Sequence, residues 1–157
     1  MKQKTLIFLV RPNEERVLLA MKKRGFGMGK WNGVGGKVES GESVRAAAVR
    51  ETQEEIGVML REEDLASRGV ISFSFAGQPE LTQGVHVFFA ERWEGEPEES
   101  EEMRPAWCAV SAIPYDEMWI DDRYWLPIAL SGTSITARFH FSATGDAILE
   151  SDIVHHP

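Results

Sequence analysis

Cysteine and long apolar runs are both scarce in this 157-residue chain. Its one cysteine, Cys108, has no partner for an internal disulfide, so the chain is not a disulfide-stapled scaffold and a reducing compartment is favoured. The apolar run nearest the N-terminus, Leu6 to Val10, is far too short for the core of a signal peptide or for a membrane span. We therefore expect a cytoplasmic protein that does not enter a membrane.

Basic residues are also in short supply. Lys and Arg total 17 against 25 for Asp and Glu, which gives a formal net charge of −8. A nucleic-acid polymer is bound by a basic surface that neutralises its phosphates, so this composition argues against such a partner. A small phosphorylated molecule stays compatible, because a bound divalent cation reverses the local field. The length fits one domain spanning residues 1–157, and we expect a monomer.

Apolar alternation predicts that strands dominate the chain. Two segments break this pattern and predict helices: 43–56, which Ser43 can cap and Gly57 can end, and 122–130. Residues 94–102 hold six glutamates and predict an acidic loop. The expected fold class is α/β or α+β, with strands at 5–10, 17–21, 69–75, 85–90, 107–110, 135–141 and 147–154.

The chemistry is concentrated in the first of these helices. Glu51, Glu54 and Glu55 stand at i, i+3 and i+4, so their carboxylates share one helix face. Like charges at these spacings destabilise an isolated helix, and a hard divalent cation would offset the repulsion because Mg²⁺ takes oxygen ligands and bridges carboxylates to phosphates. A solvated acidic face is the ordinary alternative for three such glutamates.

The residues around this helix follow a longer pattern. From Gly36 to Val58 the chain reads G-x5-E-x7-R-E-T-x-E-E-x-G-V. In this spacing the segment resembles the Nudix box, and the chain resembles the Nudix hydrolase superfamily. Thr52 departs from the pattern, which usually has a bulky apolar residue there, and we expect Thr52→Leu to be neutral or mildly stabilising because leucine has the better helix propensity.

The resemblance implies a Nudix fold, in which a mixed β-sheet is sandwiched between helices and carries a catalytic loop-helix-loop. It further implies hydrolysis of a phosphoanhydride with Mg²⁺, for which Mn²⁺ can substitute. By position, Arg50 and Glu42 would pair and orient the helix. The implied metal ligands, among whose glutamates the general base stays open, are Gly35, through its carbonyl, Glu51, Glu54, Glu55 and Glu102.

Sequence outside the box is more discriminating. It resembles the MutT-homologue diphosphatases of oxidised purine nucleoside triphosphates, a group that sanitises the nucleotide pool and so prevents mutation. This resemblance implies hydrolysis of 8-oxo-dGTP or 2-hydroxy-dATP to the monophosphate and pyrophosphate. The segments that carry it are MKKRGFG (21–27), WNGVGGKV (31–38), GQPEL (77–81), EMRP (102–105) and MWIDDRYW (118–125).

The same resemblance implies a nucleobase pocket away from the box helix. Trp119 offers a stacking face, Asn32 a donor and an acceptor, and Lys22 a cation for phosphate or sugar oxygens. The substrate-binding residues implied, position by position, are Thr5, Lys22, Phe26, Asn32, Val34, Gly35, Gly36, Lys37, Phe73, Met103, Trp119, Ile120, Asp121 and Asp122.

The adjacent carboxyls of Asp121 and Asp122 invite a sharper hypothesis. Burial and like charge each raise a carboxyl pKa, so we expect this pair to share about one proton at neutral pH. The shared proton would let one pocket read both an oxidised guanine and an oxidised adenine, as the resembling family does. The alternative is that Asp121 only caps a helix and Asp122 only faces solvent.

Two other functions stay open at this point. One keeps the enzyme class and changes the substrate to a dinucleoside polyphosphate, a nucleotide sugar or capped RNA. The other is a nucleotide-binding Nudix module without catalysis, which would be expected to lose box glutamates. This chain keeps all of them, which favours the enzyme.

Overall fold

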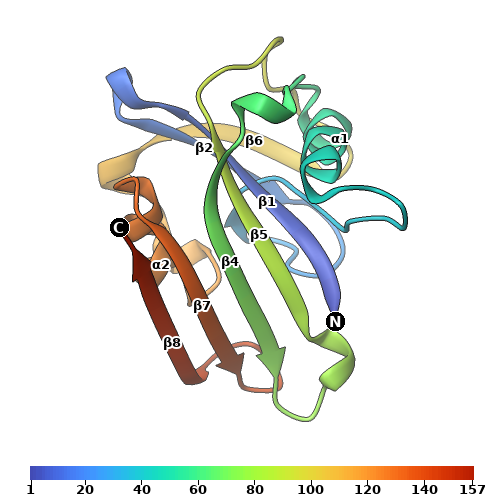
Figure 1. Cartoon of the computed structure of the whole chain (residues 1–157), viewed down its shortest axis with the longest axis vertical. Helices are drawn as coiled ribbons and strands as arrows, with labels where there is room; N and C mark the ends of the chain where they lie inside the picture. Colours follow the sequence, from blue (N-terminus) through green and yellow to red (C-terminus); the bar gives the residue numbers. More distant parts are fainter.

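The computed structural model describes residues 1–157 and shows a mixed β-sheet with one long helix on each face (Figure 1). The sheet has eight strands in the order β3-β2-β1-β5-β4-β7-β8, and β6 pairs with β2 off this path. β1 and β5 run parallel, as do β4 and β7, whereas the other neighbours are antiparallel. The expected fold class, a mixed sheet between helices, is confirmed.

Most predicted elements form, and several are longer than the sequence indicated. Two predicted strands are also shifted. The strand predicted at 107–110 begins at Met103 and ends at Ala109, because pairing with β2 extends it toward the acidic loop, and the strand predicted at 147–154 is Ile148–His156. The strands are β1 (Lys2–Arg11), β2 (Arg16–Lys22), β3 (Trp31–Asn32), β4 (Ala66–Phe75), β5 (Gln83–Ala90), β6 (Met103–Ala109), β7 (Ser134–Phe141) and β8 (Ile148–His156), and the helices are α1 (Val44–Ile56) and α2 (Asp122–Leu130).

The ends of α1 follow from local chemistry. The Ser43 hydroxyl accepts a hydrogen bond from the Ala46 amide at 3.0 Å, which satisfies one of the unpaired donors of the first turn. Gly57 adopts φ +72° and its amide donates to the Gln53 carbonyl at 2.9 Å, a conformation that glycine reaches without a steric penalty. The predicted cap and stop are therefore confirmed.

Two apolar layers hold the helices to opposite faces of the sheet. Alternate residues of β1 serve the two layers: Leu6 and Phe8 pack with Trp125 of α2, and Ile7 and Leu9 pack on the side of α1. β1 thus lies between α1 and α2, and each of its two faces packs in a different apolar layer. No helix of the chain has both the length and the apolar character needed to cross a bilayer.

Candidate active site

The segment after β3 runs close against β1 and brings the start of the box to the sheet. Ile7 and Val34 exchange backbone hydrogen bonds at 2.6 and 3.0 Å. A Cβ at Gly35 would lie 1.9 Å from the Thr5 carbonyl oxygen, and a Cβ at Gly36 would lie 2.4 Å from the carboxyl carbon of Glu51. Gly35 is required because the backbone of β1 occupies the space of a side chain, and a side chain at Gly36 would displace the Glu51 carboxylate.

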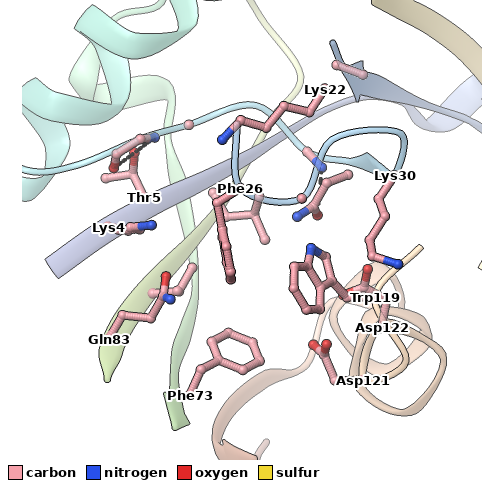
Figure 2. A pocket seen from close by; sticks show the side chains of 18 of the residues that line it. Lys4, Thr5, Lys22, Phe26, Lys30, Phe73, Gln83, Trp119, Asp121 and Asp122 are labelled. Carbon is pink, nitrogen blue, oxygen red and sulfur yellow. Dashed lines mark hydrogen bonds between the residues drawn. The ribbon is translucent and has the colours of Figure 1, made fainter. Parts of the chain in front are cut away.

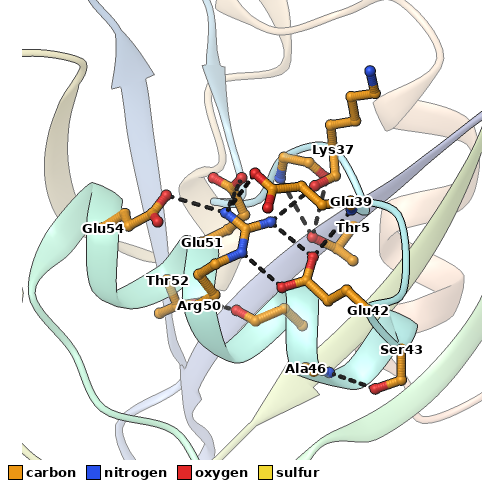
Figure 3. Close-up of polar contacts among 12 residues, drawn as sticks. Thr5, Lys37, Glu39, Glu42, Ser43, Ala46, Arg50, Glu51, Thr52 and Glu54 are labelled. Atoms are coloured by element: carbon orange, nitrogen blue, oxygen red, sulfur yellow. Dashed lines mark hydrogen bonds and ion pairs between the residues drawn. The ribbon is translucent and has the colours of Figure 1, made fainter.

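Arg50 is the centre of the polar network on α1 (Figure 3). Its Nε and Nη2 donate to the two carboxylate oxygens of Glu42 at 2.7 and 2.9 Å, and Nη2 also donates to the Lys37 carbonyl at 3.0 Å. Its Nη1 reaches Glu51 at 2.9 Å and Glu54 at 3.2 Å. The expected Arg50–Glu42 pair is present, and it ties the loop before α1 to the middle of the helix.

The hydrogen bonds from Arg50 lower the pKa of Glu42 to about 2, whereas burial raises the pKa of Glu51 despite the same arginine. Glu42 is therefore a permanent anion that pairs with Arg50. Glu51 is held next to Gly36 in a more desolvated position, where an additional positive charge would stabilise its ionised form.

Glu55 is the most buried carboxyl of α1, with 3% of its surface exposed. Its Oε1 accepts from the Gly35 amide at 3.0 Å, and its Oε2 is buried without any hydrogen-bond partner. Burial, together with repulsion from Glu51 and Glu102, raises the pKa of Glu55 to about 8. A buried carboxylate oxygen without a donor, beside a second carboxylate, is the kind of hard oxygen donor that a divalent cation binds.

The remaining predicted ligands do not converge on Glu55 as the side chains stand. Glu54 is exposed and Glu102 contacts Nη2 of Arg24 at 3.3 Å. No group of three acidic, histidine or cysteine side chains is gathered closely enough to hold a metal ion. Glu55 and Glu51 fit a cation site, and Glu54 and Glu102 would join it only by changing rotamer.

Apart from these carboxylates, the structure has a cavity of about 170 Å³ on the other face of β1 (Figure 2). Its walls are aromatic: the rings of Phe26 and Trp119 lie 5.3 Å apart, and Phe75 meets Trp119 edge-on at 6.3 Å. Phe73 stacks on Phe141 at 5.7 Å in the floor. Flat apolar walls of this kind suit a planar ring system.

Asp121 and Asp122 close one end of this cavity, and both are only 2% exposed. Asp121 accepts a hydrogen bond from Trp125 Nε1 at 2.7 Å, and Oδ2 of Asp122 is buried without a partner. Burial raises the pKa of Asp121 to about 6 and, with repulsion from Asp121, raises that of Asp122 well above its usual value. These shifts fit a pair that shares a proton near neutral pH.

The alternative in which Asp121 only caps a helix and Asp122 only faces solvent is wrong. Asp122 does not face solvent, and Asp121, although it occupies the position before α2, makes no capping hydrogen bond with its side chain. Both carboxyls point toward the aromatic cavity instead (Figure 2).

The structure gathers most of the predicted substrate-binding residues at this cavity and leaves three outside it. Val34 is buried in the layer under α1, Lys37 does not line the cavity and accepts a hydrogen bond from Arg50 with its carbonyl, and Ile120 packs against the core. The predicted residues that line the cavity are Thr5, Lys22, Phe26, Asn32, Gly35, Gly36, Phe73, Met103, Trp119, Asp121 and Asp122.

Three polar residues that the sequence did not single out also line the cavity: Lys4, Lys30 and Gln83. The alternation of β1 is a signal that could have located Lys4, because it shares a face with Leu6. Nζ of Lys30 lies 5.3 Å from the Trp119 ring. Gln83 faces the cavity from β5, and no local pattern marks it.

Comparison with family models identifies the family of the chain. The model of the NUDIX domain matches residues 1–128, and the chain belongs to the Nudix family.

Within that family the chain is similar to a narrower group. It is 48% identical over 146 residues to the oxidized purine nucleoside triphosphate hydrolase of Danio rerio, covering 93% of this chain and 90% of that protein. It is 47% identical over 137 residues to the protein of the same name from Mus musculus, covering 87% and 85%. The crystal structure of a MutT protein from Bacillus halodurans has the same fold, with a TM-score of 0.83, 24% identity and coverage of 98% and 97%.

Proposed function

We propose that this protein hydrolyses oxidised purine nucleoside triphosphates, of the 8-oxo-dGTP and 2-hydroxy-dATP type, to the nucleoside monophosphate and pyrophosphate. The observation that carries the proposal is the pairing of a complete box helix with an aromatic cavity that ends in two buried carboxyls. The identity of almost half the residues with hydrolases named for such substrates supports it. The activity would remove damaged precursors before they enter DNA.

The phosphate chemistry belongs to the face of β1 that carries α1. Glu51, Glu55 and the Gly35 carbonyl would hold Mg²⁺, with Glu54 and Glu102 available after a rotamer change. When bound there, the cation would supply positive charge to the phosphate oxygens and lower the pKa of a water. Arg50 keeps Glu51 in place and fixes the loop through Glu42 and Lys37. Glu55, whose pKa is raised, is a candidate to accept the proton of the attacking water.

Base recognition belongs to the other face. Trp119 and Phe26 together offer the base an aromatic wall, and Asn32 keeps its amide donors free because its Oδ1 accepts from the Gly33 amide at 2.9 Å. Asp121 and Asp122 present one donor and several acceptors as long as they share a proton. An oxidised guanine and an oxidised adenine differ in their donor and acceptor edge, so moving that proton fits either base.

The Nudix domain in this proposal comprises the whole chain, residues 1–157. β7 and β8 both lie beyond the matched segment but continue the same sheet, and Phe139 and Phe141 of β7 belong to the core under the cavity. We also propose a monomer that works in the cytoplasm, which the single free cysteine supports. Size-exclusion chromatography with light scattering tests the oligomeric state.

The reaction is tested with purified protein, MgCl₂ and a panel of 8-oxo-dGTP, 2-hydroxy-dATP, dGTP, ADP-ribose and diadenosine polyphosphates. We expect pyrophosphate as the released product and the highest kcat/KM on the two oxidised nucleotides. Release of inorganic phosphate would contradict the proposed bond cleavage. A higher kcat/KM on ADP-ribose or diadenosine polyphosphates would favour another Nudix substrate class.

A further inference from the structure

Lys4 is a polar residue of β1 that faces the aromatic cavity. The strand alternates, so Lys4 shares its face with Leu6, while Thr5 faces the loop of Gly36 and exchanges hydrogen bonds with it. Its register partner on β5, Val85, also lines the cavity. Lys4 is therefore directed to the cavity by the sheet and is not a side chain at a frayed end.

The ammonium of Lys4 has no counterion in the protein. No carboxylate forms an ion pair with it, although the chain carries eight more acidic than basic side chains. Burial lowers its pKa, and the neighbouring Lys22, Lys2 and Lys37 lower it further. A half-buried cation among other cations is costly unless an anion binds there.

Lys4 lies between the two sites. Its backbone bridges to Lys37 in the loop that leads to α1, and its Nζ lies 5.8 Å from the ring of Phe26. In Figure 2 Phe26 stands between Lys4 and Trp119, with the two aspartates on the far side of Trp119. A base that lies against these rings with its recognition edge at the two aspartates would thus keep that edge away from Lys4 and direct its sugar and phosphate toward it.

We propose that Lys4 is a specificity-determining residue that binds the phosphate attached to the nucleoside, where the substrate passes from the aromatic cavity to α1. This inference rests on the proposed function. An ammonium that meets a phosphate oxygen forms a charge-assisted hydrogen bond, and the neighbouring lysines add to the attraction. A nucleoside without phosphate gains nothing from this contact.

The test compares two ligands that differ only in that phosphate. The affinities of 8-oxo-dGMP and 8-oxo-deoxyguanosine are measured by tryptophan fluorescence in EDTA, so neither metal nor turnover contributes. Lys4→Met is expected to weaken 8-oxo-dGMP about tenfold or more and to leave 8-oxo-deoxyguanosine within about twofold. Lys4→Arg, which keeps the charge, is expected to restore most of the affinity for 8-oxo-dGMP.

Lys2→Met is the matched control. Lys2 lies two residues earlier on the same strand, is exposed and does not line the cavity, so its removal changes the field without removing a contact. It is expected to change either affinity less than about twofold. An equal loss for both ligands in Lys4→Met, an equal loss in Lys2→Met, or no loss at all would each overturn the assignment of Lys4. Wild-type protein that binds neither ligand would overturn the proposed function itself.

Discussion

At the scale of single residues, two carboxyl groups are buried with one oxygen unpaired. Glu55 and Asp122 each keep one oxygen buried without a hydrogen-bond donor, and they lie at the two different sites. Buried polar atoms are almost always paired in folded proteins, because an unpaired one loses its hydration without compensation. In the proposed function each orphaned oxygen would gain its partner from a ligand, a cation for Glu55 and a base edge for Asp122.

Glu55 yields a prediction about pH. Its pKa of about 8 in the fold exceeds the ordinary value of 4.5, so the folded state binds the proton more tightly than the unfolded chain does. The contribution of Glu55 to the free energy of unfolding is therefore fully present below about pH 4.5 and is lost as pH rises through about 8. In EDTA, Glu55→Gln should remove this part of the pH dependence, and thermal unfolding from pH 4 to 9 measures the difference.

The same substitution should lower activity, although it removes a destabilising effect of the Glu55 carboxylate at high pH. Glu55→Gln is expected to lower kcat by roughly 10² or more with Mg²⁺ present, because the amide neither holds a hard cation well nor accepts a proton. Glu54→Gln is the matched variant on the exposed side of α1. It should also lose activity, while its unfolding profile in EDTA follows that of wild type. Near-normal kcat in both variants would identify the glutamates as a solvated face.

Proton sharing between Asp121 and Asp122 predicts that replacing either one changes the preference between the two oxidised nucleotides. Asp121→Asn and Asp122→Asn each freeze one arrangement of donors and acceptors. Each is therefore expected to shift the ratio of kcat/KM between 8-oxo-dGTP and 2-hydroxy-dATP by about 1–3 kcal/mol. The measurement is kcat/KM for both nucleotides in both variants. An unchanged ratio in either variant is incompatible with proton sharing, whatever the overall activity.

At the scale of the element, α1 serves packing and chemistry with different faces. Ala47, Ala48 and Ile56 are buried against the sheet, while Arg50 and Glu54 remain on the polar side. Local signals, Ser43 as the cap and Gly57 as the stop, predicted the extent and the two ends of this helix, because those depend on residues within one turn of each other. It did not predict that Glu55 is buried and Glu54 exposed, because that depends on the loop of Gly35 folding over the helix.

Thr52 is a second position whose burial the sequence did not predict. The sequence and the structure therefore predict opposite effects of Thr52→Leu on stability. Helix propensity alone predicts that Thr52→Leu is neutral or mildly stabilising. In the structure Thr52 has no exposed surface, and its hydroxyl donates to the Ala48 carbonyl at 2.8 Å. A larger side chain at a filled position should instead cost about 1–3 kcal/mol of stability. Chemical denaturation of the variant decides between the two signs.

At the scale of the whole molecule, β1 separates the two sites. The cavity lies on the face of the sheet that carries α2, and the box glutamates lie on the face that carries α1. The loop around Gly35 and Gly36 borders both, as do Lys22 and Met103. Under the proposed function, this arrangement would put the base and the reacting phosphates of one substrate on opposite sides of a strand, so each would be held by a rigid part of the fold.

Separate sites predict that base binding does not require the metal. Adding EDTA should abolish hydrolysis completely, yet 8-oxo-deoxyguanosine should bind with an affinity within about threefold of that with Mg²⁺, because no predicted metal ligand forms the aromatic walls. Calorimetry with and without Mg²⁺ makes the comparison, with Trp119→Ala as the control that removes the stacking face. Loss of nucleoside binding in EDTA would mean that the cation also shapes the cavity.

The amino-acid sequence alone determined the box helix and its caps, the strand pattern, the Arg50–Glu42 pair and most of the predicted residues that line the aromatic cavity. These follow from short-range rules, in which spacing of a few residues decides which side chains share a face, or from a motif that matches residue by residue. Only the tertiary structure decided that Val34, Lys37 and Ile120 lie outside the cavity and that Lys4 and Gln83 lie within it. It also decided which carboxyls are buried. Exposure and pKa depend on what packs against a side chain from distant segments, and the register of β1 with β5 and the course of the Gly35 loop set those neighbours.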